Sequence, residues 1–347
     1  MNHKAFADFT GAPAKDRLEV FRETANRLGA PVGNIEKDFW VCWTLDALYN
    51  RLPDDSPRML FKGGTSLSKA YGLIERFSED IDVTVFRDDL DQAATIAELE
   101  ALSGNKRNDR LNAIRDACRK YISGSLRNQL ADLFTDVTAG AGRIEVDEAD
   151  RDGQTLLLWY PEVEERDAAY VQPAVRIESG AKSALDPNQP VTITPYVANE
   201  LADIDLSVPN VTTIEASRTF WDKVVILHGL RHWFINRGEL KGGGNRVSRH
   251  YYDLHKLMNS EVGKSAVKNL ALGVDCVAHA RMFFNRAPFD LASAKPPTFS
   301  LSPEDGMYDD LKRDYAAMSM MIFGEPPAFD AIVESVGEVE RTINALK

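Results

Sequence analysis

Hydrophobic and polar positions divide the chain into stretches of different texture. Residues 15–28, and a run that begins at Asn34 and continues to Leu48, show the three-to-four-residue spacing of helices, with Asn34 as the expected N-cap. Two further helices are expected over 90–102 and 108–133. Four later segments alternate or carry β-branched and aromatic residues, which favours strands: 143–146, 155–161, 171–178 and 191–197.

From Pro209 onward the helical spacing returns, and Thr212 and Thr213 are the expected caps of the first helix. The helical segments are 214–235, 247–258, 265–280, 307–323 and 328–346. The pattern therefore predicts a mixed α/β domain over residues 1–206, followed by a helical domain over residues 207–347.

Residues 60–86 carry the most informative arrangement of polar side chains. An apolar strand leads into Gly63 and Gly64, a helical stretch from Ser66 to about Ile74 follows, and a second apolar strand carries Asp80 and Asp82. Residues two apart on a strand point to the same face, so the two carboxylates lie side by side. Two adjacent carboxylates repel each other and require a cation. Oxygen ligands with room for waters suit Mg²⁺, with Mn²⁺ as an alternative.

The glycine pair predicts a phosphate site beside this metal site. Glycine lets backbone N–H groups approach a phosphate closely, and a helix N-terminus favours negative charge. We expect Gly63, Gly64, Thr65 and Ser66 to hold the phosphates of a nucleoside triphosphate (NTP). The alternative, a solvated acidic loop, is disfavoured by the apolar residues that flank the two aspartates.

These motifs resemble those of a known family. Gly-Gly, a helix and then Asp-x-Asp resembles the signature of the polymerase-β-like nucleotidyltransferase superfamily. The longer string FKGGTSLSKAYGLIERFSEDIDV, residues 61–83, resembles the AbiEii/AbiGii toxin family, as do IEKDFWVCWTL at 35–45 and AKPPTF at 294–299. The resemblance implies a mixed sheet with flanking helices, and a C-terminal helical domain that completes the active site. It also implies a toxin of an abortive-infection-type toxin–antitoxin pair.

The resemblance suggests three further site residues. Lys223 interrupts the apolar stretch TFWDKVVILH, and the family's corresponding lysine contacts the triphosphate; the alternative is a lysine that reaches the surface. Asp253, in RHYYDLHKL, matches the family's catalytic aspartate, although His250 replaces an earlier aspartate of that pattern. For both residues the alternative is an ion pair on a helix surface. Glu178 is the candidate third metal ligand, and an ion pair with Arg176 on the same strand is the alternative.

Charge is unevenly distributed along the chain. The 347 residues carry a formal net charge of −12, yet residues 218–256 hold eight Lys or Arg against three acids. A basic segment on an acidic protein can be a footprint for an anionic partner, and a solvated helix face is the alternative. The candidate acceptor-binding residues are Arg231, Arg237, Lys241, Arg246 and Arg249.

Composition restricts the class of protein. Apolar residues make up 44% of the chain and charged residues 27%, as in ordinary globular proteins, and no apolar run is long enough to span a bilayer. The three cysteines, Cys42, Cys118 and Cys276, are widely spaced and fit reduced thiols of a cytoplasmic protein without membrane partners. Four histidines lie between residues 228 and 255, but no zinc motif joins them.

The resemblance implies Mg²⁺-dependent transfer of a nucleoside monophosphate (NMP) from an NTP to the 3′ end of tRNA, which blocks translation. A cognate antitoxin encoded beside the toxin is the expected partner. Three alternatives stay open: a protein hydroxyl as acceptor, a small-molecule acceptor, and a nucleotide-binding regulatory protein with little turnover. The paired aspartates, Lys223 and Asp253 argue against the last.

Overall fold

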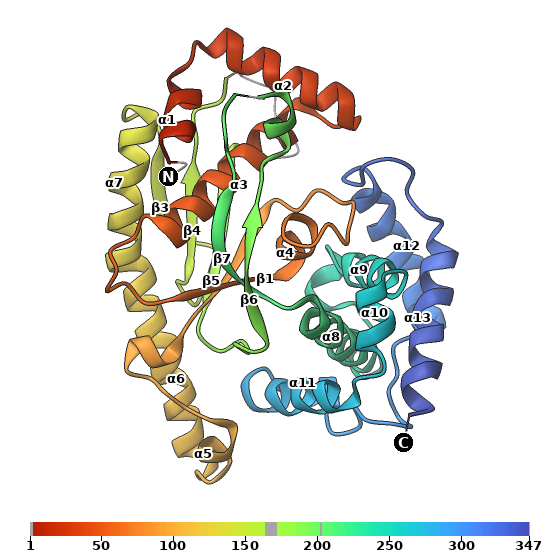
Figure 1. The fold of residues 1–347 in the computed structure, drawn as a ribbon. Helices are drawn as coiled ribbons and strands as arrows, with labels where there is room; N and C mark the ends of the chain where they lie inside the picture. The colour runs from red at the N-terminus through yellow and green to blue at the C-terminus, as the bar shows by residue number, and fades with distance from the viewer. Residues whose placement is uncertain (1–2, 164–171, 202, 347) are drawn as a thin grey trace. The chain divides into compact units, whose positions relative to one another are not determined.

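The computed structural model describes residues 3–163, 172–201 and 203–346, and the chain forms two compact units (Figure 1). The sheet unit comprises Met1–Ala70, Phe77–Ala94 and Gly104–Thr213. The helical unit comprises Tyr71–Arg76, Thr95–Ser103 and Ile214–Lys347. Two short segments of the N-terminal half therefore fold with the C-terminal half.

A seven-stranded mixed sheet forms the centre of the sheet unit, in the order β3-β4-β5-β2-β1-β7-β6 (Figure 1). The strands are β1 Met59–Lys62, β2 Asp80–Val85, β3 Arg143–Val146, β4 Thr155–Trp159, β5 Ala174–Gly180, β6 Asn188–Ile193 and β7 Val208–Ile214. β2 pairs antiparallel with β1 and parallel with β5. The strand with the two aspartates is therefore central, where both neighbours fix its position.

Helices cover this sheet. They are α1 His3–Gly11, α2 Ala14–Leu28, α3 Val32–Asn50, α4 Gly63–Lys69, α6 Gly104–Tyr121 and α7 Arg127–Thr138, with a π-helical turn at Ile122–Leu126 between the last two. α3 is almost entirely buried because its aromatic side chains pack on all sides: Trp40 stacks on Tyr160 with ring centroids 5.6 Å apart, and Trp43 contacts Phe134. Such a helix belongs to the core rather than to a surface.

The helical unit is built around α8 Ala216–Arg237 (Figure 1). The other helices are α5 Ile96–Glu100, α9 Ser248–Met258, α10 Glu261–Ala266, α11 Leu270–Phe283, α12 Asp305–Ser319 and α13 Phe329–Asn344. α9, α10 and α11 pack on α8, while α12 and α13 pack on α9. No helix of the described residues is long and apolar enough to cross a membrane.

The predicted fold class, a mixed sheet with flanking helices followed by a helical half, is confirmed. Several boundaries are wrong. α3 begins at Val32 after Pro31, so Asn34 is not its cap, and α1 was not predicted. Thr212 and Thr213 cap no helix because they lie in β7, which also contains Pro209. The predicted strand 171–178 begins at Ala174, and Val171 lies outside the described residues.

The helix after the glycine pair also differs from the prediction. α4 begins at Gly63 and ends at Lys69, whereas a helix from Ser66 to about Ile74 was expected. Tyr71–Arg76 instead joins the helical unit, where the Tyr71 hydroxyl donates to the Ile214 carbonyl at 2.8 Å and the Phe323 N–H donates to the Glu75 carbonyl at 2.7 Å. These contacts hold the segment extended and end the helix early.

Candidate active site

The two motif aspartates occupy alternate positions on β2, as the sequence predicts. Ile81 and Val83 are completely buried, while Asp80 and Asp82 are half-buried on the opposite face. The strand therefore uses one face for the core and presents both carboxylates on the other.

This pair of carboxylates fits a magnesium ion. Mg²⁺ is usually held by one or two carboxylates, retains several waters and takes further oxygens from substrate phosphates. Within residues 3–163, 172–201 and 203–346, no group of three or more His, Cys, Asp or Glu side chains is arranged to hold a metal. The donor set thus matches a metal shared with a phosphate substrate rather than one enclosed by the protein.

Glu178 lies directly opposite Asp82 in the parallel pairing of β2 with β5, so both side chains point to the same face. Its carboxylate is engaged by Arg176, with Oε1 3.0 Å from Nε, and Arg176 also reaches Asp147 at 3.1 Å. The register favours Glu178 as a third ligand, whereas the ion pair is the alternative that the sequence left open. Its role as a ligand stays a prediction.

The glycine turn packs directly against Asp82. Gly63 has φ +80°, and a Cβ atom at this position would lie 2.0 Å from Asp82 Oδ2. Glycine is therefore required both by the backbone conformation and by the space that the carboxylate occupies. The turn and the aspartate form a single structural element.

Thr65 and Ser66 fasten this turn to the sheet. The Thr65 hydroxyl donates to the Asp80 carbonyl and lies 2.8 Å from the Ser78 hydroxyl, while the Ser66 hydroxyl donates to the Gly63 carbonyl at 2.9 Å. Both side chains are buried. The first N–H groups of a helix have no partner within it, so any phosphate contact here falls to the backbone rather than to these hydroxyls.

Lys223 and Asp253 form a buried cluster in the helical unit. Lys223 Nζ lies 2.8 Å from Asp253 Oδ2 and 3.2 Å from His250 Nδ1. Arg76 donates to both oxygens of Asp253, at 2.8 and 3.0 Å. Asp253 is completely buried and Lys223 is 6% exposed, so neither belongs to an ion pair on a helix surface.

Charge in this cluster is governed by burial and by the close ion pairs. Burial alone would raise the pKa of Asp253, but Arg76 and Lys223 overcome it and hold that pKa well below its usual range. Burial lowers the pKa of Lys223, against the attraction of Asp253. Burial and Lys223 lower the pKa of His250 well below its usual value, so the ring is neutral at pH 7 and can accept from Lys223.

These contacts make Asp253 a positioning residue. Its Oδ1 is taken by Arg76, and its Oδ2 is shared by Arg76 and Lys223. A completely buried carboxylate engaged in this way is suited to orient Lys223 rather than to bind a metal.

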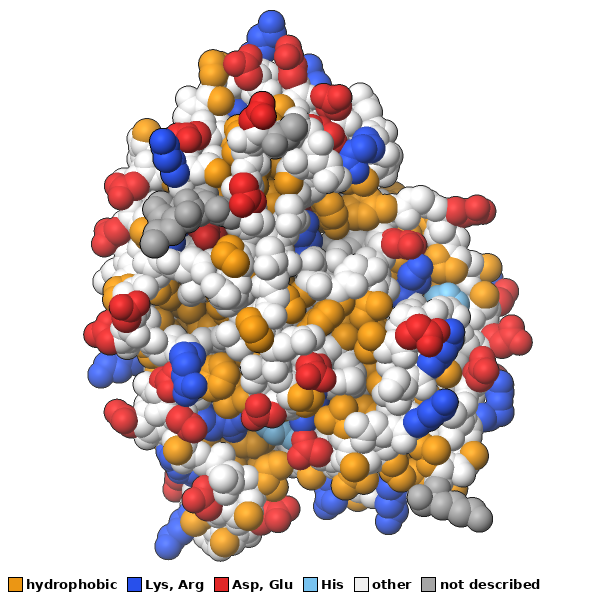
Figure 2. Space-filling view, in the orientation of Figure 1, with side chains coloured by type: hydrophobic (Ala, Val, Ile, Leu, Met, Phe, Trp, Pro, Cys, Tyr) orange, Lys and Arg blue, Asp and Glu red, His pale blue; other side chains and the backbone are white. Residues whose placement is uncertain are grey.

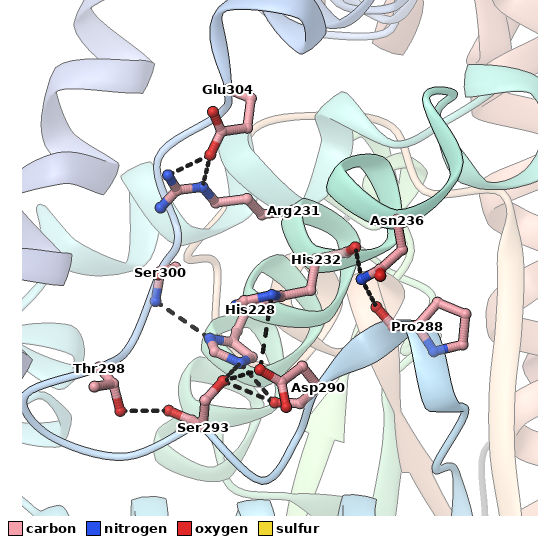
Figure 3. A network of polar contacts seen from close by, with 10 residues as sticks. All are labelled: His228, Arg231, His232, Asn236, Pro288, Asp290, Ser293, Thr298, Ser300 and Glu304. Atoms are coloured by element: carbon pink, nitrogen blue, oxygen red, sulfur yellow. Dashed lines mark hydrogen bonds and ion pairs between the residues drawn. The ribbon is translucent and has the colours of Figure 1, made fainter.

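The predicted acceptor-binding residues lie in different environments. Arg231 is paired with Glu304, with Nε 2.8 Å from Oε1 (Figure 3). Arg237 and Arg246 are exposed, whereas Lys241 is half-buried with its Nζ 5.8 Å from the Phe289 ring centroid. Acidic and basic side chains are intermixed on the face drawn in Figure 2. Arg237, Lys241 and Arg246 thus remain the better candidates for an anionic partner.

The comparisons with known proteins follow from this geometry. The family model described as nucleotidyl transferase AbiEii toxin, type IV toxin–antitoxin system, matches residues 46–335. The chain belongs to the AbiEii nucleotidyltransferase toxin family. It is also similar to MenT4, a nucleotidyltransferase toxin from Mycobacterium tuberculosis H37Rv, with 16% identity, a TM-score of 0.49, and coverage of 97% of this chain and 91% of that one. No curated protein matches the chain.

Membership of the AbiEii family confirms the resemblance, the nucleotidyltransferase class and the type IV toxin–antitoxin setting. It implies an NTP substrate and a cognate antitoxin.

Sequence reasoning missed several side chains that support this AbiEii site. Lys62 is paired with Asp82 across β1 and β2, with Nζ 3.8 Å from Oδ1. Arg76, which holds Asp253, is separated from it by 177 positions along the chain. The antiparallel register reveals Lys62, but no tight turn between the two strands indicated that register in advance.

Two buried ion pairs anchor the motif to α3. Lys37 contacts Glu79 at 3.0 Å, beside the first motif aspartate, and Asp38 contacts Lys69 on α4 at 2.7 Å. All four side chains are at most 12% exposed. The run Glu36-Lys37-Asp38 within an apolar helix was an available signal, because buried charges must be paired.

The histidines of α8 form a structural network rather than a zinc site. His228 Nε2 lies 3.1 Å from the Asp290 carbonyl, and His228 Nδ1 accepts from the Ser300 N–H at 3.2 Å (Figure 3). Both ring nitrogens are therefore engaged within the protein. Burial lowers the pKa of His228 to about 4.

This lowered pKa predicts acid sensitivity. Between pH 6.5 and 4 the unfolded chain binds a proton at His228 that the folded chain does not, so folding stability falls as the pH is lowered through this window. We expect His228→Gln to reduce the drop in melting temperature between pH 7 and pH 5. His250, whose pKa is shifted in the same direction, accounts for part of the drop that remains. Thermal melts with His279→Gln as control check this; an unchanged drop would contradict it.

Proposed function

We propose that this chain is a Mg²⁺-dependent nucleotidyltransferase toxin that transfers NMP from an NTP to the 3′ end of tRNA and thereby blocks translation in the cytoplasm. The observation that carries the metal and nucleotide assignment is the packing of the Gly63 turn against Asp82, beside Asp80 on the same strand. It places a phosphate-binding turn and a pair of metal-binding carboxylates in one element of the sheet unit.

The chemistry assigns a role to each group. The acceptor hydroxyl oxygen forms a bond to the α-phosphorus, the bond from that phosphorus to the β-bridging oxygen breaks, and pyrophosphate leaves with the electron pair. The hydroxyl proton passes to solvent. Asp80 and Asp82 would hold the Mg²⁺, which neutralises phosphate charge when bound. The backbone of Gly63 and Gly64 would bind phosphate, and Lys223 would stabilise the leaving pyrophosphate.

A polyanionic acceptor is supported by the segment that follows α8. Exposed Arg237 and Arg246 flank three consecutive glycines with φ of 68°, 71° and 83°, and Lys241 lies between them. Contacts with phosphates make RNA binding depend on salt, with a slope of about −0.7 per contact for single strands. A protein hydroxyl or a small molecule would not require such a series of cations.

The test is to incubate the purified protein with each α-labelled NTP and total RNA, and to identify which macromolecule takes up the label. We expect label on tRNA, and Glu substitutions at Arg237, Lys241 and Arg246 together should weaken tRNA binding and flatten its salt dependence. Label on protein, or on neither polymer, would contradict the tRNA assignment. An unchanged salt series in the triple variant would remove the structural support for it.

Lys223→Met should reduce transfer at least tenfold, or about 1.4 kcal/mol, because the ammonium is lost while the apolar stem is kept. Arg76 continues to neutralise Asp253 in this variant, so the fold should persist. Lys256→Met is the matched control, since it breaks the more exposed pair with Glu75 on α9. Transfer rates and thermal melts of both variants decide: a loss below tenfold would return Lys223 to a structural role.

A further inference from the structure

Arg249 has a guanidinium group that its surroundings leave unsatisfied. It lies one turn before Asp253 on α9, so both side chains share one face of the helix. Its Nε is buried and has no hydrogen-bond partner, and Arg249 makes no ion pair with the part of the chain that the structure describes. A buried donor without a partner costs about 1–3 kcal/mol, so such a group calls for a ligand.

The cluster around Arg249 carries an excess of positive charge. Arg76, Lys223 and Arg249 are cationic, and Asp253 is the carboxylate that contacts the first two. Arg249 is close enough to lower the pKa of both Lys223 and His250. Because His250 is neutral, it does not offset this charge. Excess charge in a buried setting is unfavourable unless an anion compensates for it.

Neighbouring acids do not supply that compensation. Glu75 is paired with Lys256, with Nζ 3.0 Å from Oε2. Asp314 accepts from the Arg246 and Ser248 N–H groups, at 2.7 Å each, and so caps the N-terminus of α9. The remaining place for negative charge beside Arg249 is a ligand.

We propose that Arg249 binds the pyrophosphate portion of the NTP next to Lys223, an inference that rests on the proposed function. Nε and one Nη form the edge of a guanidinium that grips a phosphate through two parallel hydrogen bonds. Pyrophosphate concentrates several charges within one group, which matches cations clustered on one helix face. RNA phosphates, spread along a strand, match the exposed Arg237 and Arg246 better. Arg249 thus belongs to the nucleotide rather than to the acceptor patch expected from the sequence.

Calorimetric titration of the full chain tests this. The ligands are inorganic pyrophosphate, the α,β-methylene analogues of the four NTPs, and the four NMPs. Arg249→Gln should weaken binding of pyrophosphate and of the preferred analogue at least tenfold. NMP and tRNA binding should be unchanged. Arg249→Lys should fall between wild type and Arg249→Gln, because it keeps the charge but loses the fork. Arg281→Gln, an exposed arginine on α11, is the matched control and should bind as wild type.

The outcomes separate the inference from the proposed function. If wild type binds an analogue but Arg249→Gln binds it and pyrophosphate equally well, the inference is overturned and the proposed function stands. Loss of tRNA binding with retained pyrophosphate binding would assign Arg249 to the acceptor, which also overturns it. If wild type binds no analogue, the proposed function itself fails. Thermal melts of the four proteins show whether a loss reflects unfolding.

Discussion

Asp82→Asn should abolish nucleotidyl transfer while leaving the chain at least as stable as wild type. The substitution keeps the shape of the side chain but removes one of two adjacent carboxylates, and with it the charge that holds a divalent cation. We expect a loss of at least ~10³-fold, about 4 kcal/mol. Relief of repulsion between Asp80 and Asp82 offsets loss of the half-exposed contact with Lys62, 3.8 Å away. Asp80→Asn should behave alike.

Transfer of labelled NMP, calorimetric Mn²⁺ binding and thermal melting measure these effects separately. Asp88→Asn is the matched control, because Asp88 is an exposed carboxylate shortly after β2. It should keep wild-type transfer and metal binding. Wild-type activity in either folded motif variant would exclude β2 as the metal site. A variant that loses activity but binds Mn²⁺ normally would assign the carboxylates a role other than metal binding.

Gly63→Ala should eliminate activity through geometry alone, without a change of charge. The added Cβ would lie 2.0 Å from Asp82 Oδ2 and 2.7 Å from its Cγ, so the carboxylate or the turn must move. A displacement of this size separates the phosphate-binding turn from the metal ligands, and misplacement by about 1 Å can cost ~10²-fold. We therefore expect at least a hundredfold loss of transfer.

Gly72→Ala separates this clash from backbone strain. Gly72 also has a positive φ, +60°, but nothing lies within 4 Å of a Cβ built there. Both variants carry a left-handed alanine, which costs about 1–2 kcal/mol, and should lose similar melting temperature. Only Gly63→Ala should lose transfer out of proportion to stability. Equal losses in the two would show that the turn acts through stability rather than through Asp82.

Local patterning predicted the elements whose residues determine their own environment. The alternation in β2 needs only the period of a strand, so Asp80 and Asp82 were correctly placed on one face. α9 was correct within one residue because its apolar positions repeat regularly. β7 was missed because Pro209 and two threonines also suit a helix start, and only pairing of Phe61 with Thr213 in the sheet makes the segment a strand.

The sequence by itself determined the family, the α/β character and the motif side chains, since these depend on residue type and on spacing over a few positions. The tertiary structure decided which charges meet. Arg76 reaches Asp253 because Tyr71–Arg76 folds with the helical unit, and α3 holds the motif through Lys37 and Asp38. Such pairs depend on contacts between residues far apart in the chain, and no local periodicity encodes them. Burial then gives them their effect, because a charge inside the protein must find a partner, whereas the same residue on the surface need not.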